Sequence, residues 1–134
     1  MNFLELLDEV KKIKSDHRRI STADFFEMVI EWTELAALTK ILKSFFGEPR
    51  KPVDVCPNDE VESITAPYGG IWQNQTLYYQ ENEKEFYMVM LWPWTDGMLI
   101  TVKLIRGEKK NVLNASANTS SKNFWEKLRA LFPS

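Results

Sequence analysis

The sequence predicts an α+β fold in a single domain spanning residues 1–134. We expect two N-terminal helices, of which the second is long, then an antiparallel β-meander of four to five strands, and a C-terminal helix packed with the sheet. Three observations predict this order: helical apolar spacing before residue 47, strand-like apolar runs separated by turn residues between 71 and 115, and another helical stripe after residue 121.

The first helix is expected over residues 2–15. Apolar residues recur there at helical spacing and form one stripe, with acidic residues early and lysines late, an order that favours the helix dipole at both ends. Because so short a helix is not stable alone, its stripe must pack against another element.

A second helix is expected to begin at Ser21 and to continue through Phe46. Ser21 and Asp24 approximate a capping box, and Gly47 followed by Pro49 indicates the end. At about 1.5 Å per residue this helix is roughly 37 Å long, enough to cross a small sheet.

This long helix has apolar stripes on two nearly opposite sides, and a helix that is apolar on two sides is covered on both. We expect the broad stripe to cover the sheet. The first helix, a partner protein or a second subunit would cover the other stripe, which consists of Phe26, Ile30, Ala37 and Ile41.

The segment between this helix and the sheet is expected to hold short edge strands. Four prolines break residues 47–68, where 53–56 and 61–65 have strand-like composition, and Tyr68-Gly69-Gly70 indicates a turn. A strand is expected over 76–80, with 71–75 either continuing it or forming a separate strand. A two-residue turn at Asn82-Glu83 leads from it into the next strand.

The stretch 85–106 is the centre of the predicted sheet. Two apolar runs flank Thr95-Asp96-Gly97, which suits a three-residue hairpin loop with Gly97 in the left-handed conformation. Because strand side chains alternate between faces, this loop places eight apolar residues on one buried face. The predicted pairs are Trp94 with Met98, Trp92 with Ile100, Met90 with Val102 and Met88 with Leu104.

Two further elements are expected towards the C-terminus. Residues 110–115 are expected to return as a strand, and residues 122–132 to form a helix that ends before Pro133. The stripe of this helix consists of Phe124, Trp125, Leu128, Leu131 and Phe132.

Composition restricts the classes of function. A net charge of −2 argues against a nucleic-acid-binding protein, and the basic cluster at residues 11–19 lacks interleaved aromatics. The single cysteine permits no intramolecular disulfide. No segment reaches the roughly 18 apolar residues of a membrane span, and residues 1–9 lack the features of a signal peptide, so we expect a cytoplasmic protein.

No catalytic, metal or cofactor site is predicted. His17 is the only histidine and Cys56 the only cysteine, too few for a typical metal cluster, and nucleophile-elbow and phosphate-loop motifs are absent. Glu27, Glu31 and Glu34 share one face of the predicted helix, where they could do acid/base chemistry, but we interpret them as a solvated strip.

Two hypotheses for the function remain. The first is a non-enzymatic protein-interaction or adaptor domain that could form a homodimer, which the double-striped helix favours. The alternative is a small-molecule-binding domain or enzyme with a cavity between sheet and long helix, near Met88, Met90, Trp92 and Trp32. Aromatic residues including Tyr78 are further candidates to line a pocket or docking surface. The candidate ligand- or partner-binding residues are Trp72, Trp94, Tyr68, Tyr87, Phe26, Ile30 and Ile41.

Overall fold

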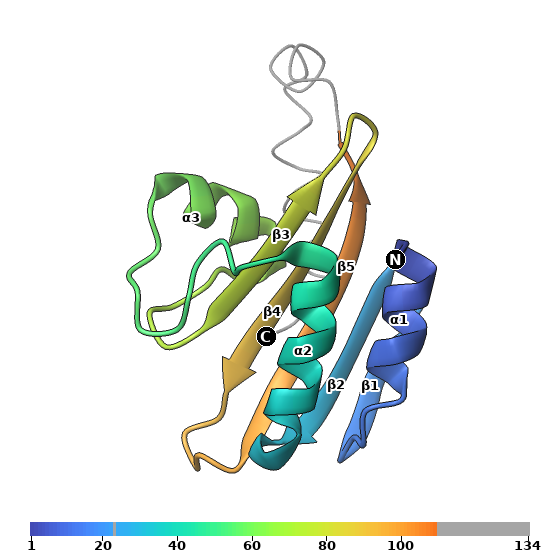
Figure 1. Ribbon diagram of the computed structural model, residues 1–134. Coiled ribbons are helices and arrows are strands. Elements are labelled where there is room, and N and C mark those ends of the chain that lie inside the picture. Colours follow the sequence, from blue (N-terminus) through green and yellow to red (C-terminus); the bar gives the residue numbers. More distant parts are fainter. Residues whose placement is uncertain (23, 110–134) are drawn as a thin grey trace.

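A computed structural model describes residues 1–22 and 24–109 of the chain, and it confirms an α+β fold with an antiparallel sheet (Figure 1). The predicted strand 110–115 and the predicted helix 122–132 lie outside the described residues. In chain order the elements are α1 Phe3–Lys11, β1 His17–Ser21, β2 Phe25–Glu31, η1 Trp32–Glu34, α2 Leu35–Phe46, α3 Asp59–Thr65, η2 Ala66–Tyr68, β3 Thr76–Glu81, β4 Glu85–Pro93 and β5 Leu99–Glu108.

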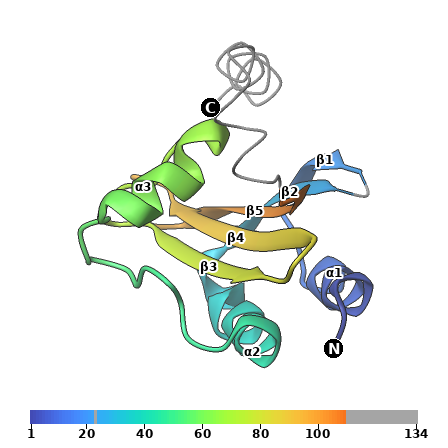
Figure 2. The ribbon, with the colours of Figure 1, turned by 90° about the horizontal axis from the view of Figure 1, so that it is seen from above.

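Five strands form one sheet in the order β1-β2-β5-β4-β3, and each pair of neighbours is antiparallel. The consecutive strands β3, β4 and β5 make the expected meander, and the β1–β2 hairpin extends it beyond β5. Helices α1 and α2 lie on one face of the sheet, and α3 lies on the other (Figure 2). The sheet is therefore the middle of three layers.

The first helix is confirmed as α1, although it ends at Lys11 and not at residue 15 as predicted. The Asn2 side chain caps it by accepting a hydrogen bond of 2.8 Å from the backbone N–H of Glu5, while Glu5 and Lys11 lie at the dipole ends that suit their charges. Its buried residues pack with α2 and one face of the sheet in a hydrophobic cluster that we call the first core. This core includes Phe3, Leu6, Leu7, Val10, Phe26, Met28, Ile30, Leu38, Leu42, Tyr78, Val89, Leu91, Ile100, Val102 and Leu104.

The long second helix was predicted wrongly over its N-terminal half. Residues 17–21 and 25–31 are the strands β1 and β2, and only Leu35–Phe46 is α-helical. The predicted capping box at Ser21 and Asp24 belongs instead to a hairpin turn, in which the Thr22 N–H donates to the Phe25 carbonyl at 2.8 Å. Gly47, with φ of 76°, ends the helix as expected.

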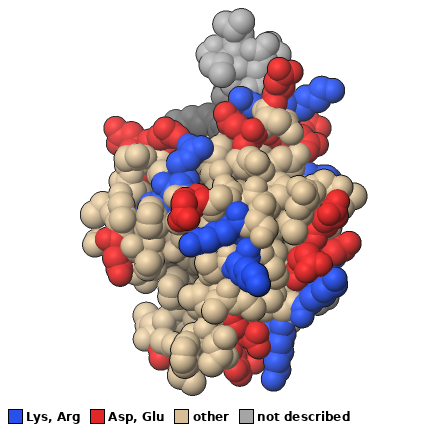
Figure 3. Space-filling model, in the orientation of Figure 1, with Lys and Arg blue, Asp and Glu red and all other residues tan. Residues whose placement is uncertain are grey.

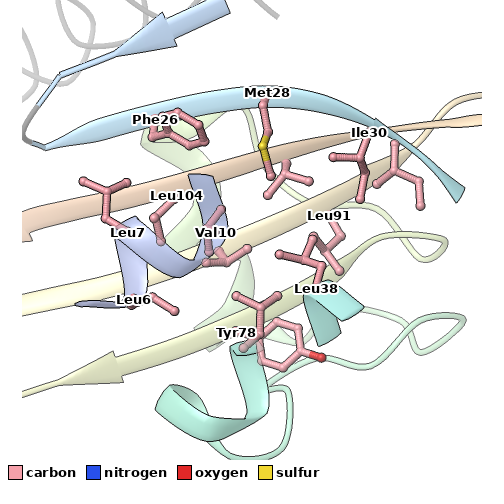
Figure 4. Packing of buried hydrophobic residues seen from close by; sticks show 14 of the residues in the cluster. Leu6, Leu7, Val10, Phe26, Met28, Ile30, Leu38, Tyr78, Leu91 and Leu104 are labelled. Atoms are coloured by element: carbon pink, nitrogen blue, oxygen red, sulfur yellow. The ribbon is translucent and has the colours of Figure 1, made fainter. Parts of the chain in front are cut away.

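The two apolar stripes arise because β2 is buried on both faces. Its residues 25–30 are all buried, so the polar–apolar alternation that identifies a half-exposed strand is missing. Phe26, Met28 and Ile30 point towards α1 and α2 and join the first core (Figure 4). Phe25 belongs to a second hydrophobic cluster, beneath α3, which we call the second core. This core consists of Phe25, Val61, Tyr68, Ile71, Leu77, Met88, Met90 and Ile105.

The β4–β5 register differs from the prediction by one residue. Trp92 pairs with Thr101, Met90 with Lys103 and Met88 with Ile105, and the connection occupies residues 95–98. The Asp96 carboxylate accepts hydrogen bonds from the N–H groups of Met98 and Leu99, at 2.8 and 3.3 Å, which accommodates the extra residue.

This one-residue shift moves half of the predicted apolar face to the other side of the sheet. Met88 and Met90 face α3 in the second core, whereas Val102 and Leu104 face α1 and α2 in the first. Gly97 nevertheless has the predicted left-handed conformation, with φ of 71°.

The β3–β4 turn lies one residue later than predicted, at Glu83-Lys84. The Asn82 side chain accepts hydrogen bonds of 2.8 Å from the N–H groups of both Lys84 and Glu85. A turn at Asn82-Glu83 would pair Leu77 with Met88, whereas the observed turn pairs Leu77 with Met90. Because this register differs by two residues, the same side chains remain on the predicted shared face.

The predicted edge strand at 61–65 is also wrong, because these residues belong to α3. Asn58 caps that helix by accepting a hydrogen bond of 2.9 Å from the Val61 N–H, a start signal that the sequence analysis missed. Residues 53–55 form a turn and a bend, and the nearest strand-like contact is an isolated bridge between Lys51 and Leu77. The turn at Gly69-Gly70 is confirmed, with φ of 103° and 74°.

Alanine substitutions of Phe26 and Trp32 test the revised fold, because the sequence predicted both residues on one helix. We expect Phe26→Ala to lower the free energy of unfolding by about 3–5 kcal/mol, because it empties a fully buried site. Trp32→Ala removes a side chain that is largely exposed and should cost about 0.5 kcal/mol or less. Urea unfolding followed by circular dichroism measures both changes, and similar costs would contradict this strand assignment.

Candidate functional site

A groove with a volume of about 290 Å³ runs between α2 and the sheet. One wall is a side of α2, the opposite wall is the loop that follows the helix, and the floor comes from β3, β4 and β5. Most of the lining side chains are apolar, as is usual for sites that bind small organic molecules. The lining residues are Leu35, Thr39, Lys43, Glu48, Pro49, Pro52, Val53, Thr76, Tyr78, Leu91, Pro93 and Ile100.

Regular helix geometry brings three of these residues into one row. Leu35, Thr39 and Lys43 are four residues apart on α2, so they lie on the same side of the helix. The row changes from apolar to hydroxyl to ammonium towards the C-terminal end of the helix. The groove therefore has an apolar end and a polar end.

The polar end is a set of interacting groups around Tyr78. Burial raises the pKa of the Tyr78 hydroxyl, and the Glu48 carboxylate raises it further, whereas a hydrogen bond with Thr39 lowers it. Glu48 also lies beside Lys43, with 3.7 Å between Oε1 and Nζ. Two hydroxyls, one ammonium and one carboxylate thus meet at this end of the groove.

The loop wall is fixed to the sheet by a buried lysine. Lys51 is only 2% exposed, and its Nζ donates hydrogen bonds to the carbonyls of Pro52, Gln73 and Gln75 at 2.8, 2.8 and 2.5 Å. These acceptors match the three N–H donors of an ammonium group. Burial lowers the pKa of Lys51, and nearby Asp54 opposes that shift.

Backbone hydrogen bonds complete this attachment. The Lys51 N–H donates to the Leu77 carbonyl at 3.2 Å, and the Leu77 N–H donates back to the Lys51 carbonyl at 3.0 Å. Pro52 and Val53, which line the groove, follow directly in the chain. The shape of the loop wall therefore depends on Lys51.

Three large apolar side chains near the loop wall are exposed, and we refer to them as the Trp72 patch. Val53 and Val55 lie in the loop after α2, and Trp72 lies in the loop before β3. Their exposed fractions are 52%, 48% and 72%. The two loops adjoin because the Asp54 N–H donates to the Gln73 carbonyl at 2.8 Å. A left-handed backbone at Asp54, with φ of 64°, shapes the loop between the two valines.

The structure distributes the predicted binding residues over several places. Phe26 and Ile30 are buried in the first core, against which half-buried Ile41 and Tyr87 also pack. Tyr68 is buried in the second core.

The remaining two predicted residues are tryptophans in loops. Trp72 is exposed, whereas Trp94 is half-buried and its Nε1–H donates to the Thr101 hydroxyl at 2.8 Å. The seven predicted residues therefore do not form one site. Of the aromatic residues considered from sequence, Tyr78 lines the groove.

The row of glutamates predicted on one helix face does not exist. Glu27 lies in β2 and is buried, with its Oε1 3.7 Å from Lys103 Nζ, so it is not solvated as we expected. Glu31 ends the same strand, and Glu34 ends η1. The three carboxylates would lie in one row on a helix, but they are separated because Glu27 and Glu31 belong to a strand and Glu34 to η1.

Several groove residues were missed, although the sequence contains a signal for some of them. The spacing of Leu35, Thr39 and Lys43 is visible without a structure, but it does not show what faces them. Their partners on β3 and β4, such as Tyr78 and Leu91, depend on the strand register.

Two searches of the described residues address other classes of site. Among residues 1–22 and 24–109, no group of three or more histidine, cysteine, aspartate or glutamate side chains is placed to hold a metal ion. Within the same ranges, every helix is too short or too polar to cross a membrane. Charges of both signs are interspersed on the face that carries α2 (Figure 3).

Comparisons of the chain with protein-family models, curated protein sequences and solved structures found no significant match. The site must therefore be interpreted from its own geometry.

Replacing Lys51 by methionine tests whether it fixes the loop wall. We expect Lys51→Met to lower the free energy of unfolding by roughly 2–4 kcal/mol, because three carbonyls lose a charged donor while the side chain keeps its length. Proteolytic cleavage within residues 48–56 should also become faster. Lys43→Met is the matched control, since Lys43 is half-exposed, and it should change neither measurement. Equal behaviour of the two variants would contradict the role of Lys51.

Proposed function

We propose that this protein is a binding domain for a small, largely apolar organic molecule, which it holds in the groove between α2 and the sheet. The observation that carries the proposal is the combination of apolar walls with hydroxyl and charged groups gathered at one end. Such an arrangement buries the body of a ligand and orients one polar group. It corresponds to the second of the two hypotheses raised by the sequence.

The volume limits the size of this ligand. At about 290 Å³ the groove is just below the range of roughly 300–1,000 Å³ that is typical of ligand pockets. A molecule with one aromatic ring or a short aliphatic chain fits this volume better than a large cofactor.

We propose binding and not catalysis for this groove. Glu48 is the one carboxylate in the described lining, and its side chain is 83% exposed, which favours ligand binding over general base catalysis at this site. Tyr78 keeps its proton at neutral pH because burial and Glu48 raise its pKa, which suits a hydrogen-bond donor.

A variant that fills the groove tests the proposal. We expect Thr39→Phe to weaken the binding of small aromatic fragments by at least about tenfold, because the new ring occupies the middle of the groove. Ala36→Phe, on an exposed position of the same helix that does not line the groove, should bind like the unmodified protein. Native mass spectrometry and two-dimensional NMR titration measure binding and its location. Fragment shifts that persist at the groove in Thr39→Phe would count against the proposal.

The Trp72 patch favours a second candidate function, the docking of a protein partner. Trp is enriched among residues that dominate binding energy, and here it is held outward by loops that Lys51 and several backbone hydrogen bonds fix in place. The second stripe of the predicted helix no longer supports an interface, since Phe26 and Ile30 are buried within the chain.

Loss of a partner on substitution of Trp72 tests this second candidate. A protein that co-purifies with the tagged chain should bind the Trp72→Ala variant more weakly by about 2 kcal/mol or more. The control variant Leu4→Ser, which alters an exposed apolar side chain on α1, should bind the partner as tightly as the unmodified protein does. A partner bound equally well by Trp72→Ala would place the interface elsewhere.

A further inference from the structure

We infer that the groove selects ligands that carry a carboxylate on an apolar or aromatic body, with the carboxylate bound beside Lys43. This inference rests on the proposed function and specifies its ligand class. It follows from the positions of Lys43, Glu48, Thr39 and Tyr78, and from the length of the groove along α2.

Lys43 is the better-placed of the two charged groups. It projects from the last turn of a regular helix and its side chain is 49% exposed, whereas the Glu48 side chain follows the helix in a loop and is 83% exposed. The lysine is therefore part of the groove wall, and the glutamate is mostly in solvent.

The existing ion pair is weak enough for a ligand to replace. Its atoms are 3.7 Å apart, longer than the roughly 2.7–2.9 Å of a charge-assisted hydrogen bond. Exposed pairs of this kind contribute little to stability. A ligand carboxylate can take the place of Glu48 at Lys43 while the Glu48 side chain turns into solvent.

The two hydroxyls supply further donors for the same group. Thr39 lies one helical turn before Lys43, and both Thr39 and Tyr78 line the groove there. A carboxylate accepts hydrogen bonds only, so an ammonium and two hydroxyls complement it. A ligand amine would have only the exposed Glu48 to pair with and would lie beside the Lys43 ammonium, which repels it.

The apolar end sets the length of the ligand body. Leu35 is eight residues before Lys43 on α2, a separation of roughly 12 Å along the helix axis. Leu91, Pro93 and Ile100 line the groove together with Leu35. A phenylalkanoate or a medium-chain fatty acid has a body of suitable length and chemistry.

A matched pair of probes separates this inference from the proposed function. The probes are 6-phenylhexanoate and its primary amide, which have the same body but differ in charge, titrated into the full chain by NMR and calorimetry. In the unmodified protein the carboxylate should bind at least about tenfold more tightly than the amide. The preference should decrease as salt is raised, since the contact is close to solvent.

Two variants assign the preference to named side chains. Lys43→Met should reduce the preference for the carboxylate probe to about twofold or less, by weakening the binding of that probe alone. Glu48→Gln should strengthen binding of the carboxylate probe several-fold, because the variant removes the group that competes for Lys43. Both positions are substantially exposed, and circular dichroism of the two variants checks that they fold.

Each outcome bears on one of the two proposals. Equal binding of both probes, or a carboxylate preference that survives Lys43→Met, overturns the carboxylate inference and leaves the groove as a site for neutral ligands. Failure of both probes to shift the resonances of groove residues overturns the proposed function as well.

Discussion

Burial of the sheet on both faces is the constraint on which the rest of the structure depends. Successive residues of β2 enter different cores, so Phe26 packs beneath α1 and α2 while Phe25 packs beneath α3. The same constraint places charged side chains inside. Lys103 and Glu27 are both buried, and Lys103 Nζ lies 3.6 Å from the centroid of the Trp92 ring. Inward-facing charges are tolerable when opposite charges and an aromatic face surround them.

This two-sided burial also explains which parts of the fold could be predicted. The helix α1 is buried on one side, so its stripe has a clear helical period, and Gly47 ends α2 in a conformation that favours glycine. The strand β2 has no alternation because both faces are buried, and helical and strand patterns are then equally consistent with its sequence. In the β4–β5 hairpin, the Asp96 carboxylate accepts hydrogen bonds from the N–H groups of Met98 and Leu99 in a loop one residue longer than predicted, an effect too local for apolar patterns to reveal.

The candidate site was less predictable than the fold because α2, the loop that follows it and three strands assemble it. The sequence suggested a cavity between sheet and long helix, but it assigned Met88 and Met90 to that cavity, and the one-residue register shift places both on the opposite face. The row formed by Leu35, Thr39 and Lys43 follows from helical spacing alone. What converts that row into a groove is the loop wall, and no local pattern indicates that Lys51 would bury its ammonium to fix that wall.

Lys51 has a further consequence for the outer edge of the sheet. β3 is an edge strand, and such strands expose unpaired backbone groups to which other chains can add. Here Leu77 is already paired with Lys51, and Pro49 and Pro52, which have no N–H groups to donate, flank that contact in the chain. At the opposite edge, the pairing of β1 with β2 is interrupted between Arg18 and Ile20. The bridge to Lys51 thereby occupies part of the β3 edge, so the residue that shapes the groove also makes this margin of the sheet a poorer template for strand addition.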